Sequence, residues 1–120
     1  MPVFINYDKA DDVQVSVNYH DRFLNNSQLI SLSKNKRNLE SEDVRRFITA
    51  TKSGVPIDLF VRKNKDDKVA KSFYYLGRME NYDNEEITMQ GSGESAVEMY
   101  WNLDVPVRED IYDYITSEDV

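Results

Sequence analysis

Residues 57–62 have the sequence Ile57-Asp58-Leu59-Phe60-Val61-Arg62, and residues 72–79 have the sequence Ser72-Phe73-Tyr74-Tyr75-Leu76-Gly77-Arg78-Met79. In the first stretch, aliphatic side chains occupy every second position, which is the period of a strand that buries one face. The second stretch is rich in aromatic residues, which favour strands. The charged segment 64–68 between them is typical of a turn, so the two stretches predict a β-hairpin.

The rest of the chain adds further strands and one clear helix to this hairpin. Apolar runs or period-2 alternation predict strands over residues 2–7, 13–19 and 96–103, and the short apolar stretch 29–32 is either a strand or irregular. Apolar side chains recur with helical spacing from Val44 to Thr51, and Ser41 can act as the N-cap of a helix over 41–52. We expect a short C-terminal helix over 108–116, and a loop over the polar residues 81–95.

These elements predict a fold of the α+β class. With 120 residues the chain has the size of one domain, and no internal boundary or repeat divides it, so residues 1–120 are expected to form a single domain. The expected architecture is a small, mostly antiparallel twisted sheet with one main helix and a short C-terminal helix.

Composition excludes several classes of protein. The sequence contains no cysteine, which rules out disulfides, thiolate metal ligands and a cysteine nucleophile. The segment from Met1 to Asp8 has neither a basic start nor a long apolar run, so we expect no signal peptide. No stretch approaches the roughly 18 apolar residues of a membrane span. We therefore expect a cytoplasmic protein without a membrane partner.

Charge is distributed unevenly along the chain. The net charge is −7, but residues 1–33 carry −2, residues 34–78 carry +6 and residues 79–120 carry −11. This pattern has two interpretations. It is either an ordinary charged surface, or a basic face for phosphate contacts with an acidic end that faces away or faces a neighbouring domain.

The chemistry-bearing residues do not form a recognisable catalytic centre. His20 is the only histidine, and no nucleophile motif such as G-x-S-x-G is present. His20 has structural, ligand-contacting and catalytic interpretations, of which the structural one is the simplest. The acidic pairs lie in expected loops, and Gly91-Ser92-Gly93 lacks the residues of a nucleotide-binding loop. We expect no catalytic residue, no metal site, no cofactor and no enzymatic activity.

Basic clusters and aromatic side chains alternate along the first two thirds of the chain. Cations for phosphates and rings for stacking are the combination that nucleic-acid sites use. The alternative is an aromatic strand with solubilising lysines around it. The residues that we expect to contact nucleic acid are Tyr19, His20, Asp21, Arg22, Lys34, Lys36, Arg37, Arg62, Lys63 and Tyr75.

Five blocks in this order carry a family resemblance over nearly the whole chain. They are Tyr19-His20-Asp21-Arg22-Phe23-Leu24, Ser33-Lys34-Asn35-Lys36-Arg37-Asn38-Leu39-Glu40-Ser41, Ile57-Asp58-Leu59-Phe60-Val61-Arg62-Lys63, Phe73-Tyr74-Tyr75-Leu76-Gly77, and Val105-Pro106 with Tyr112-Asp113-Tyr114. The sequence thereby resembles the bacterial domain-of-unknown-function family numbered 3427.

The resemblance implies a C-terminal module of a larger protein, or a stand-alone relative of one. Such parent proteins carry a superfamily-two helicase core, often with a phospholipase-D-like nuclease, and look like restriction or phage-defence enzymes. The family is similar to small, partly open β-barrels of the PUA-like kind, which hold bases or modified bases in a pocket. Members often place a large aromatic residue just before the position of Ser33, where this chain has Ser31 and Leu32.

Three hypotheses follow. The first is a non-catalytic accessory domain that binds nucleic acid, with a base, modified or flipped, held near Tyr19–Arg22 and with weak, salt-dependent affinity for DNA. The second is an interaction module that docks on the helicase or nuclease domains of a parent protein through its acidic face. The third, an enzyme in its own right, lacks any recognised motif.

Overall fold

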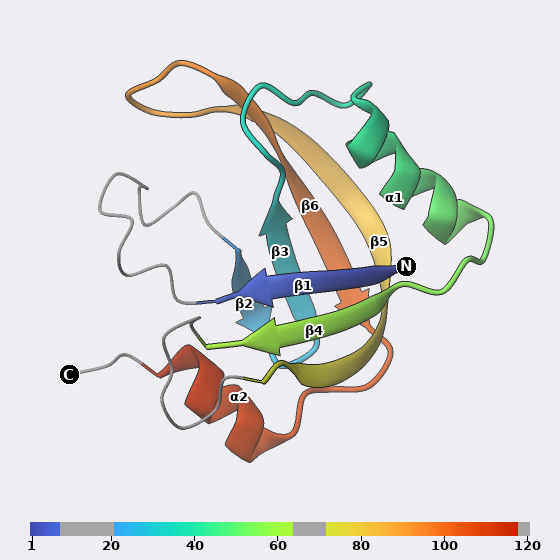
Figure 1. Ribbon diagram of the computed structural model, residues 1–120, viewed down its shortest axis with the longest axis vertical. Helices are drawn as coiled ribbons and strands as arrows, with labels where there is room; N and C mark the ends of the chain where they lie inside the picture. The colour runs from blue at the N-terminus through green and yellow to red at the C-terminus, as the bar shows by residue number, and fades with distance from the viewer. Residues whose placement is uncertain (8–20, 64–71, 118–120) are drawn as a thin grey trace.

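A computed structural model of the protein describes residues 1–7, 21–63 and 72–117 (Figure 1). The strand expected over 13–19 and the turn expected over 64–68 lie outside these residues. The described elements, in chain order, are β1 (Pro2–Asn6), β2 (Arg22–Asn25), β3 (Gln28–Leu32), α1 (Glu42–Lys52), β4 (Asp58–Arg62), β5 (Tyr74–Thr88), β6 (Ser95–Leu103) and α2 (Glu109–Thr116).

The six strands form one mixed sheet with the order β1-β4-β5-β6-β3-β2. Strands β1 and β4 are parallel, and the other four pairings are antiparallel. The predicted α+β class, with a mostly antiparallel sheet, one main helix and a short C-terminal helix, is therefore confirmed. The predicted hairpin is the pairing of β4 with the first part of β5.

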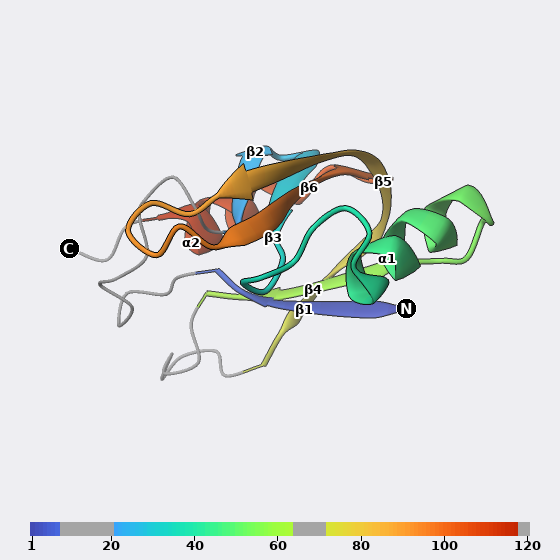
Figure 2. The same ribbon diagram turned by 90° about the horizontal axis from the view of Figure 1, so that it is seen from above.

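Strand β5 bends the sheet into a half-barrel. Its first residues pair with β4, and its remaining residues, from Met79 to Thr88, pair with β6. Two register irregularities interrupt these pairings, one beside Gly77, whose φ is +94°, and one at Tyr82. Bulges increase the bend of a strand, and glycine adopts a positive φ without steric cost. As a result β1 and β4 form one layer and β6, β3 and β2 another (Figure 2).

The core lies between the two layers. Leu59 and Val61 of β4 and Leu29 of β3 are fully buried, and full burial of such a side chain contributes roughly 1.5–3 kcal/mol. Trp101 of β6 is 1% exposed, and its indole N–H donates a hydrogen bond to Ser31 Oγ at 2.8 Å. A buried indole needs such a partner, so the serine before Leu32 serves the core.

Helix α1 covers one side of the half-barrel. Phe47 packs edge-to-face on Trp101, with ring centroids 5.7 Å apart. Ser41 occupies the predicted N-cap position, but its hydroxyl makes no cap bond and instead accepts a hydrogen bond from the backbone N–H of Asn38. The helix ends at Lys52, and Gly54 follows with a φ of +74°, as the sequence indicates.

Helix α2 and the end of β1 close the sheet at the opposite side. The ring of Tyr7, just after β1, stacks on Phe23 of β2 at 5.5 Å, and its hydroxyl accepts a hydrogen bond from the backbone N–H of Phe23 at 3.2 Å. Tyr112 of α2 packs on the same Phe23 ring, while Tyr114 packs on Tyr74 of β5. The two strands at opposite ends of the sheet order are thus brought into contact.

The expected loop over residues 81–95 is wrong. Strand β5 continues to Thr88 and β6 begins at Ser95, so a short turn remains between them. The polar side chains misled the interpretation because they line the solvated face of a paired strand. Backbone pairing with β6, such as Glu86 with Val97 and Ile87 with Ala96, overrides their weak strand preference.

Neither helix in the described part of the chain is long and apolar enough to cross a membrane.

The Tyr7 hydroxyl offers a test of this closure. Tyr7→Phe keeps the ring but leaves the Phe23 N–H without its acceptor, so the free energy of unfolding should fall by about 1 kcal/mol in urea denaturation. Tyr82→Phe, at an aromatic residue that is 45% exposed, is the matched control and should change stability by less than about 0.5 kcal/mol. Equal effects of the two substitutions would show that the hydroxyl contact does not hold the layers together.

Candidate nucleic-acid interface

Asp21 and Arg22 fix the chain where β2 begins. Asp21 is 7% exposed, and its carboxylate accepts a hydrogen bond from the backbone N–H of Leu32 at 2.7 Å. Arg22 forms an ion pair with Glu98 of β6, with the guanidinium and carboxylate 3.0 Å apart, and the Glu98 side chain is 9% exposed. These contacts place the backbone at the start of β2. Tyr19 and His20, the preceding predicted site residues, lie outside the described residues.

An aromatic wall lies beside this segment. It consists of Tyr7, Phe23 and Tyr112, which come from the end of β1, from β2 and from α2. Burial raises the pKa of Tyr7 above its ordinary value, and the hydrogen bond from Phe23 only partly opposes this. The phenol therefore stays neutral throughout the physiological range, which suits a contact between packed rings.

Arg62 and Lys63, at the end of β4, are placed differently from each other. Arg62 faces outward, donates a hydrogen bond to the Asn6 side chain at 2.5 Å, and places its guanidinium 4.5 Å from the centre of the Phe73 ring. Lys63 is 5% exposed, and its ammonium donates to Ser117 Oγ at 2.8 Å. Lys63 therefore holds the end of α2 rather than projecting from the surface.

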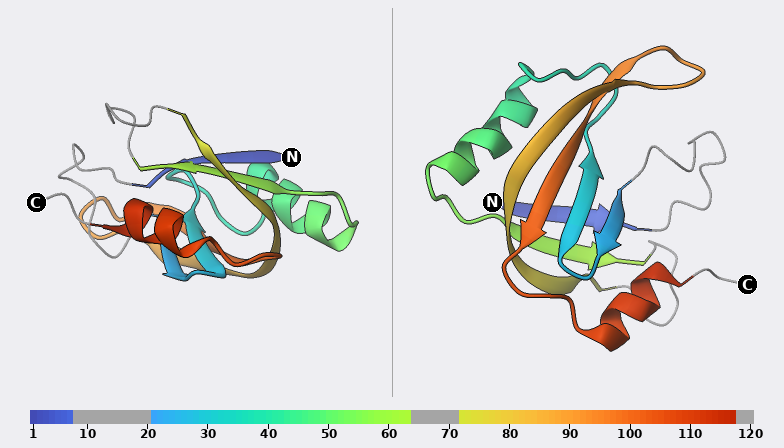
Figure 3. Two further views of the ribbon diagram at one scale, coloured as in Figure 1. Left: turned by 90° about the horizontal axis from the view of Figure 1, so that it is seen from below. Right: turned by 180° about the vertical axis from the view of Figure 1, so that it is seen from behind.

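The structure brings the predicted site residues Asp21 and Arg22 to the same end of the molecule as Arg62 and Lys63. The start of β2 and the carboxyl ends of β1 and β4 lie there together with α2 (Figure 3). The side chains of Arg22 and Arg62 nevertheless leave the outer faces of different layers. Arg22 is paired with Ile30, which lies on the opposite face of β3 from Leu29 although it is itself buried, and Arg62 follows the core residue Val61. The two arginines thus flank this end and do not line a single flat face.

The predicted site residues Lys34, Lys36 and Arg37 lie on a turn beside the start of β6. The backbone N–H of Lys36 donates to Ser95 at 2.7 Å, and Lys36 has a φ of +66°, which projects this turn from the sheet. Lys34 and Lys36 are exposed. Arg37 is paired with Asp43 at 2.9 Å. Burial acts to raise the pKa of Asp43, but the hydrogen bonds from Arg37 and the Val44 N–H and the charge of Arg37 together outweigh it, so the net shift is downward.

Tyr75, the last predicted site residue, belongs to an outward row of rings that we call the aromatic ridge, formed by Phe4, Phe60, Phe73 and Tyr75. Tyr75 is 56% exposed, and its hydroxyl donates to Asp58 at 2.8 Å, which raises the pKa of Tyr75. Sequence analysis missed the three phenylalanines as surface residues. The signal was present, because Phe60 alternates with Leu59 and Val61 in the stretch that predicted β4.

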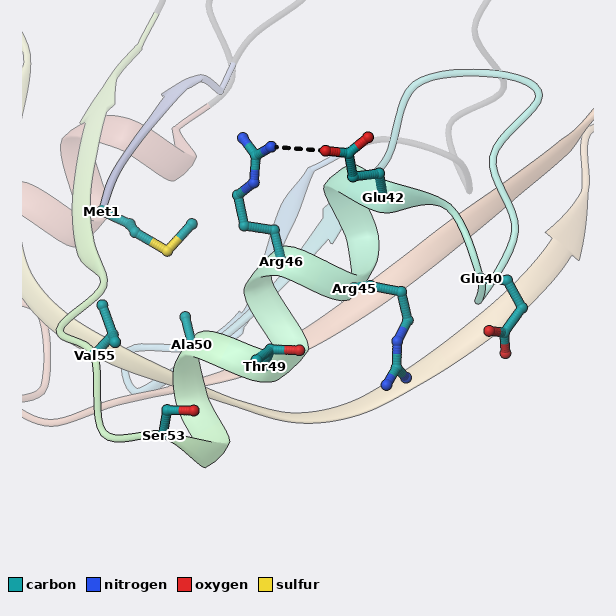
Figure 4. A pocket seen from close by; sticks show the side chains of 9 residues that line it. All are labelled: Met1, Glu40, Glu42, Arg45, Arg46, Thr49, Ala50, Ser53 and Val55. Atoms are coloured by element: carbon teal, nitrogen blue, oxygen red, sulfur yellow. Dashed lines mark hydrogen bonds and ion pairs between the residues drawn. The ribbon is translucent and has the colours of Figure 1, made fainter.

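A surface hollow of about 650 Å³ lies elsewhere, between α1 and the start of β1 (Figure 4). Met1, Ala50 and Val55 supply apolar surface, and an ion pair between Arg46 and Glu42 at 3.3 Å lies at its rim. None of the predicted site residues lines it. The mixed charges of its rim favour neither a phosphate nor a cation.

Within residues 1–7, 21–63 and 72–117, no three histidine or acidic side chains gather in a way that could hold a metal ion. The arrangement of the described residues is therefore that of a surface with anchored cations and clustered rings. It can contact phosphates and flat apolar groups.

The fold is similar to that of solved SRA domains. The SUVH5 SRA domain in a complex with fully methylated CG DNA matches with a TM-score of 0.58 and 13% identity, over 90% of this chain and 66% of that one. The same domain with hemi-methylated CG DNA gives a TM-score of 0.59 and 14% identity, over 91% and 68%. With fully hydroxymethylated CG DNA the values are 0.59 and 14%, over 90% and 67%.

SRA domains are PUA-like, so the predicted PUA-like, partly open barrel is confirmed as the fold. This chain spans about two thirds of the length of those solved domains. A comparison with curated proteins gives no match. The family described as a domain of unknown function, DUF3427, matches residues 1–115, and this protein therefore belongs to that family.

Proposed function

We propose that this protein is a non-catalytic DNA-binding domain that recognises a modified base in a duplex. The observation that carries the proposal is the fold, which is shared over 90% of the chain with SRA domains solved with methylated and hydroxymethylated DNA. An identity of 13–14% makes this a likeness of architecture. The proposal that this chain binds DNA therefore also rests on its own residues at the end of the half-barrel where β2 begins.

The end of the half-barrel where β2 begins is the proposed base site. A base that leaves the duplex needs an apolar wall and hydrogen bonds to its edge. The aromatic wall of Tyr7, Phe23 and Tyr112 lies at this end, and the buried Asp21 anchors the segment that leads to it. Tyr19 and His20, which immediately precede Asp21, are proposed as contacts of the base.

Phosphate contacts are assigned to the cations around this end and along the turn before α1. Arg22 and Arg62 flank the proposed base site, and Lys34 and Lys36 are exposed on the turn. Arginine and lysine position a protein on the DNA backbone without reading its sequence. We further propose that the domain is a cytoplasmic accessory module of a helicase or restriction-type protein, or a stand-alone relative of such a module.

A specific observation keeps the docking hypothesis as the second candidate. Three acidic side chains project into solvent from one face of β5, namely Glu80, Asp83 and Glu85, whereas Glu86 is paired with Val97 and lies on the other face. Such a row repels DNA and is complementary to a basic protein surface. It could contact the helicase core of a parent protein while the opposite side of the domain holds DNA.

Binding to modified DNA is the direct test. Fluorescence anisotropy should compare duplexes that differ only in one cytosine, 5-methylcytosine or 5-hydroxymethylcytosine. We expect micromolar affinity at low salt, and tighter binding of a modified duplex by about fourfold or more, since burying one methyl group contributes about 0.8 kcal/mol. Absence of binding to every duplex, or identical affinity for all three, would contradict the proposal.

Charge reversal at the exposed turn tests the phosphate contacts. Lys34→Glu with Lys36→Glu should weaken binding and reduce the slope of log affinity against log salt by about two, because each phosphate contact contributes about 0.9. The matched control, Arg45→Glu with Lys52→Glu, makes the same change in net charge on the exposed side of α1. If both double variants weaken binding equally, the turn makes no specific phosphate contact.

A further inference from the structure

Residues 33–38, which we call the lysine turn, follow the end of β3 and contain the two lysines that the proposed function assigns to phosphates. In the part of the chain that the structure describes, the side chains of Lys34 and Lys36 form no ion pair, whereas Arg37 of the same turn is paired with Asp43. Both lysines are also exposed. Their ammonium groups are therefore available to a phosphate.

The backbone of Lys36 has an uncommon conformation. Its φ is +66°, and among the described residues every other positive φ belongs to a glycine. In this region the Cβ of an L-residue comes close to a carbonyl oxygen, so a lysine rarely adopts it unless the surrounding structure imposes it. Here the N–H of Lys36 donates a hydrogen bond to the C=O of Ser95 at 2.7 Å, where β6 begins. The strained residue is thus also one of the two available cations.

Ser33 joins the lysine turn to β6. Its N–H donates a hydrogen bond to the C=O of Val97 at 2.9 Å, and its Oγ accepts one from the N–H of Val97 at 2.8 Å. The same hydroxyl donates a hydrogen bond to the C=O of Lys34 at 3.0 Å. Val97 is fully buried, so its N–H needs this acceptor. One hydroxyl therefore links a buried strand to the first lysine of the turn.

The other end of the lysine turn is held by the start of α1 and by β5. The N–H of Asn38 donates a hydrogen bond to Ser41 Oγ at 2.9 Å, and the N–H of Leu39 donates one to the Glu86 carboxylate at 3.2 Å. The two lysines thus lie between two anchored ends. A segment that is ordered before it binds loses less conformational freedom on binding, which raises affinity without any new contact.

We propose that Ser33 is a positioning residue for DNA binding, which holds the lysine turn in the conformation that presents Lys34 and Lys36 to phosphates. The inference rests on the proposed function, because Ser33 itself makes no contact with DNA and acts only through the two lysines. Since the turn is ordered before DNA arrives, the ammonium groups meet the phosphates without a further cost of ordering the backbone.

Removal of the Ser33 hydroxyl tests this role. Ser33→Ala should weaken binding to a duplex with one 5-methylcytosine by about threefold or more and should reduce the slope of log affinity against log salt. Thr51→Val is the matched control, because Thr51 Oγ1 also accepts a hydrogen bond from a strand N–H, that of Asn81 on β5, at 3.1 Å. Both variants should lower the midpoint of urea unfolding, but Thr51→Val should leave affinity and slope unchanged. Ser33→Thr keeps the hydroxyl and should bind like the unsubstituted protein.

A combined variant shows whether Ser33 acts through the lysines. Ser33→Ala should have no further effect on binding in a protein that already carries Lys34→Glu and Lys36→Glu. A further loss as large as in the unsubstituted background would overturn the proposal. If the two lysine substitutions weaken binding but Ser33→Ala does not, Ser33 has no positioning role, although the proposed function stands. Absence of DNA binding by the unsubstituted protein would overturn both.

Two glycine variants test the strain at Lys36 without depending on how Ser33→Ala folds. Lys36→Gly relieves the positive φ and should raise the midpoint of urea unfolding, whereas Lys34→Gly, at a residue without a positive φ, should lower it. Each variant loses one cation, so each should reduce the salt slope by about 0.9. A lower midpoint for Lys36→Gly would show that the surrounding contacts do not hold the turn in a strained conformation.

The order of the turn before binding can be measured on the unsubstituted protein. In the absence of DNA, NMR relaxation of the backbone amides from Lys34 to Arg37 should give order parameters of about 0.85, the value of a rigid backbone. Order parameters below about 0.6 would show that the lysine turn is not ordered in advance and would overturn the proposal.

Discussion

Tyr7 joins the two ends of the sheet, and the shape of the molecule depends on this contact. Strands β1 and β2 are last in the strand order at opposite ends, so no backbone pairing connects them. The Tyr7 ring stacks on Phe23, and its hydroxyl accepts a hydrogen bond from the Phe23 N–H. Tyr112 of α2 packs on the same Phe23 ring. Without these side chains, the bend of β5 and the core would still join the two layers, but the end of β1 would no longer be held against β2.

The same contact determines where a DNA site can lie. It holds the end of β1 against the beginning of β2, where Asp21 is buried and Arg22 is paired with Glu98. Asp21 and the start of β2 thereby lie next to packed rings, at the end of the half-barrel that also contains the end of β4. The aromatic ridge lies on the outer face of β1 and β4.

Periodicity predicted the elements well and their assembly less well. The alternation in residues 57–62 and the helical spacing in 41–52 correspond to β4 and α1. The polar residues of β5 hid a strand, since pairing with β6 rather than composition maintains it. Lys63 looked like a surface cation but is buried by α2, a helix more than 40 residues later in the chain. Long-range contacts of this kind depend on the register and the curvature of the sheet, which local sequence does not specify.

The most direct test of this account maps the DNA contact onto the folded chain. Backbone amide resonances should be followed by NMR while a duplex with one 5-methylcytosine is added at low salt. The account predicts the largest shifts at Asp21, Arg22 and Phe23 and weaker shifts at Lys34, Lys36 and Arg62, with little change at Phe4, Phe60 and Tyr75 of the aromatic ridge. Shifts centred on Phe4, Phe60 and Tyr75, with an unperturbed start of β2, would contradict it.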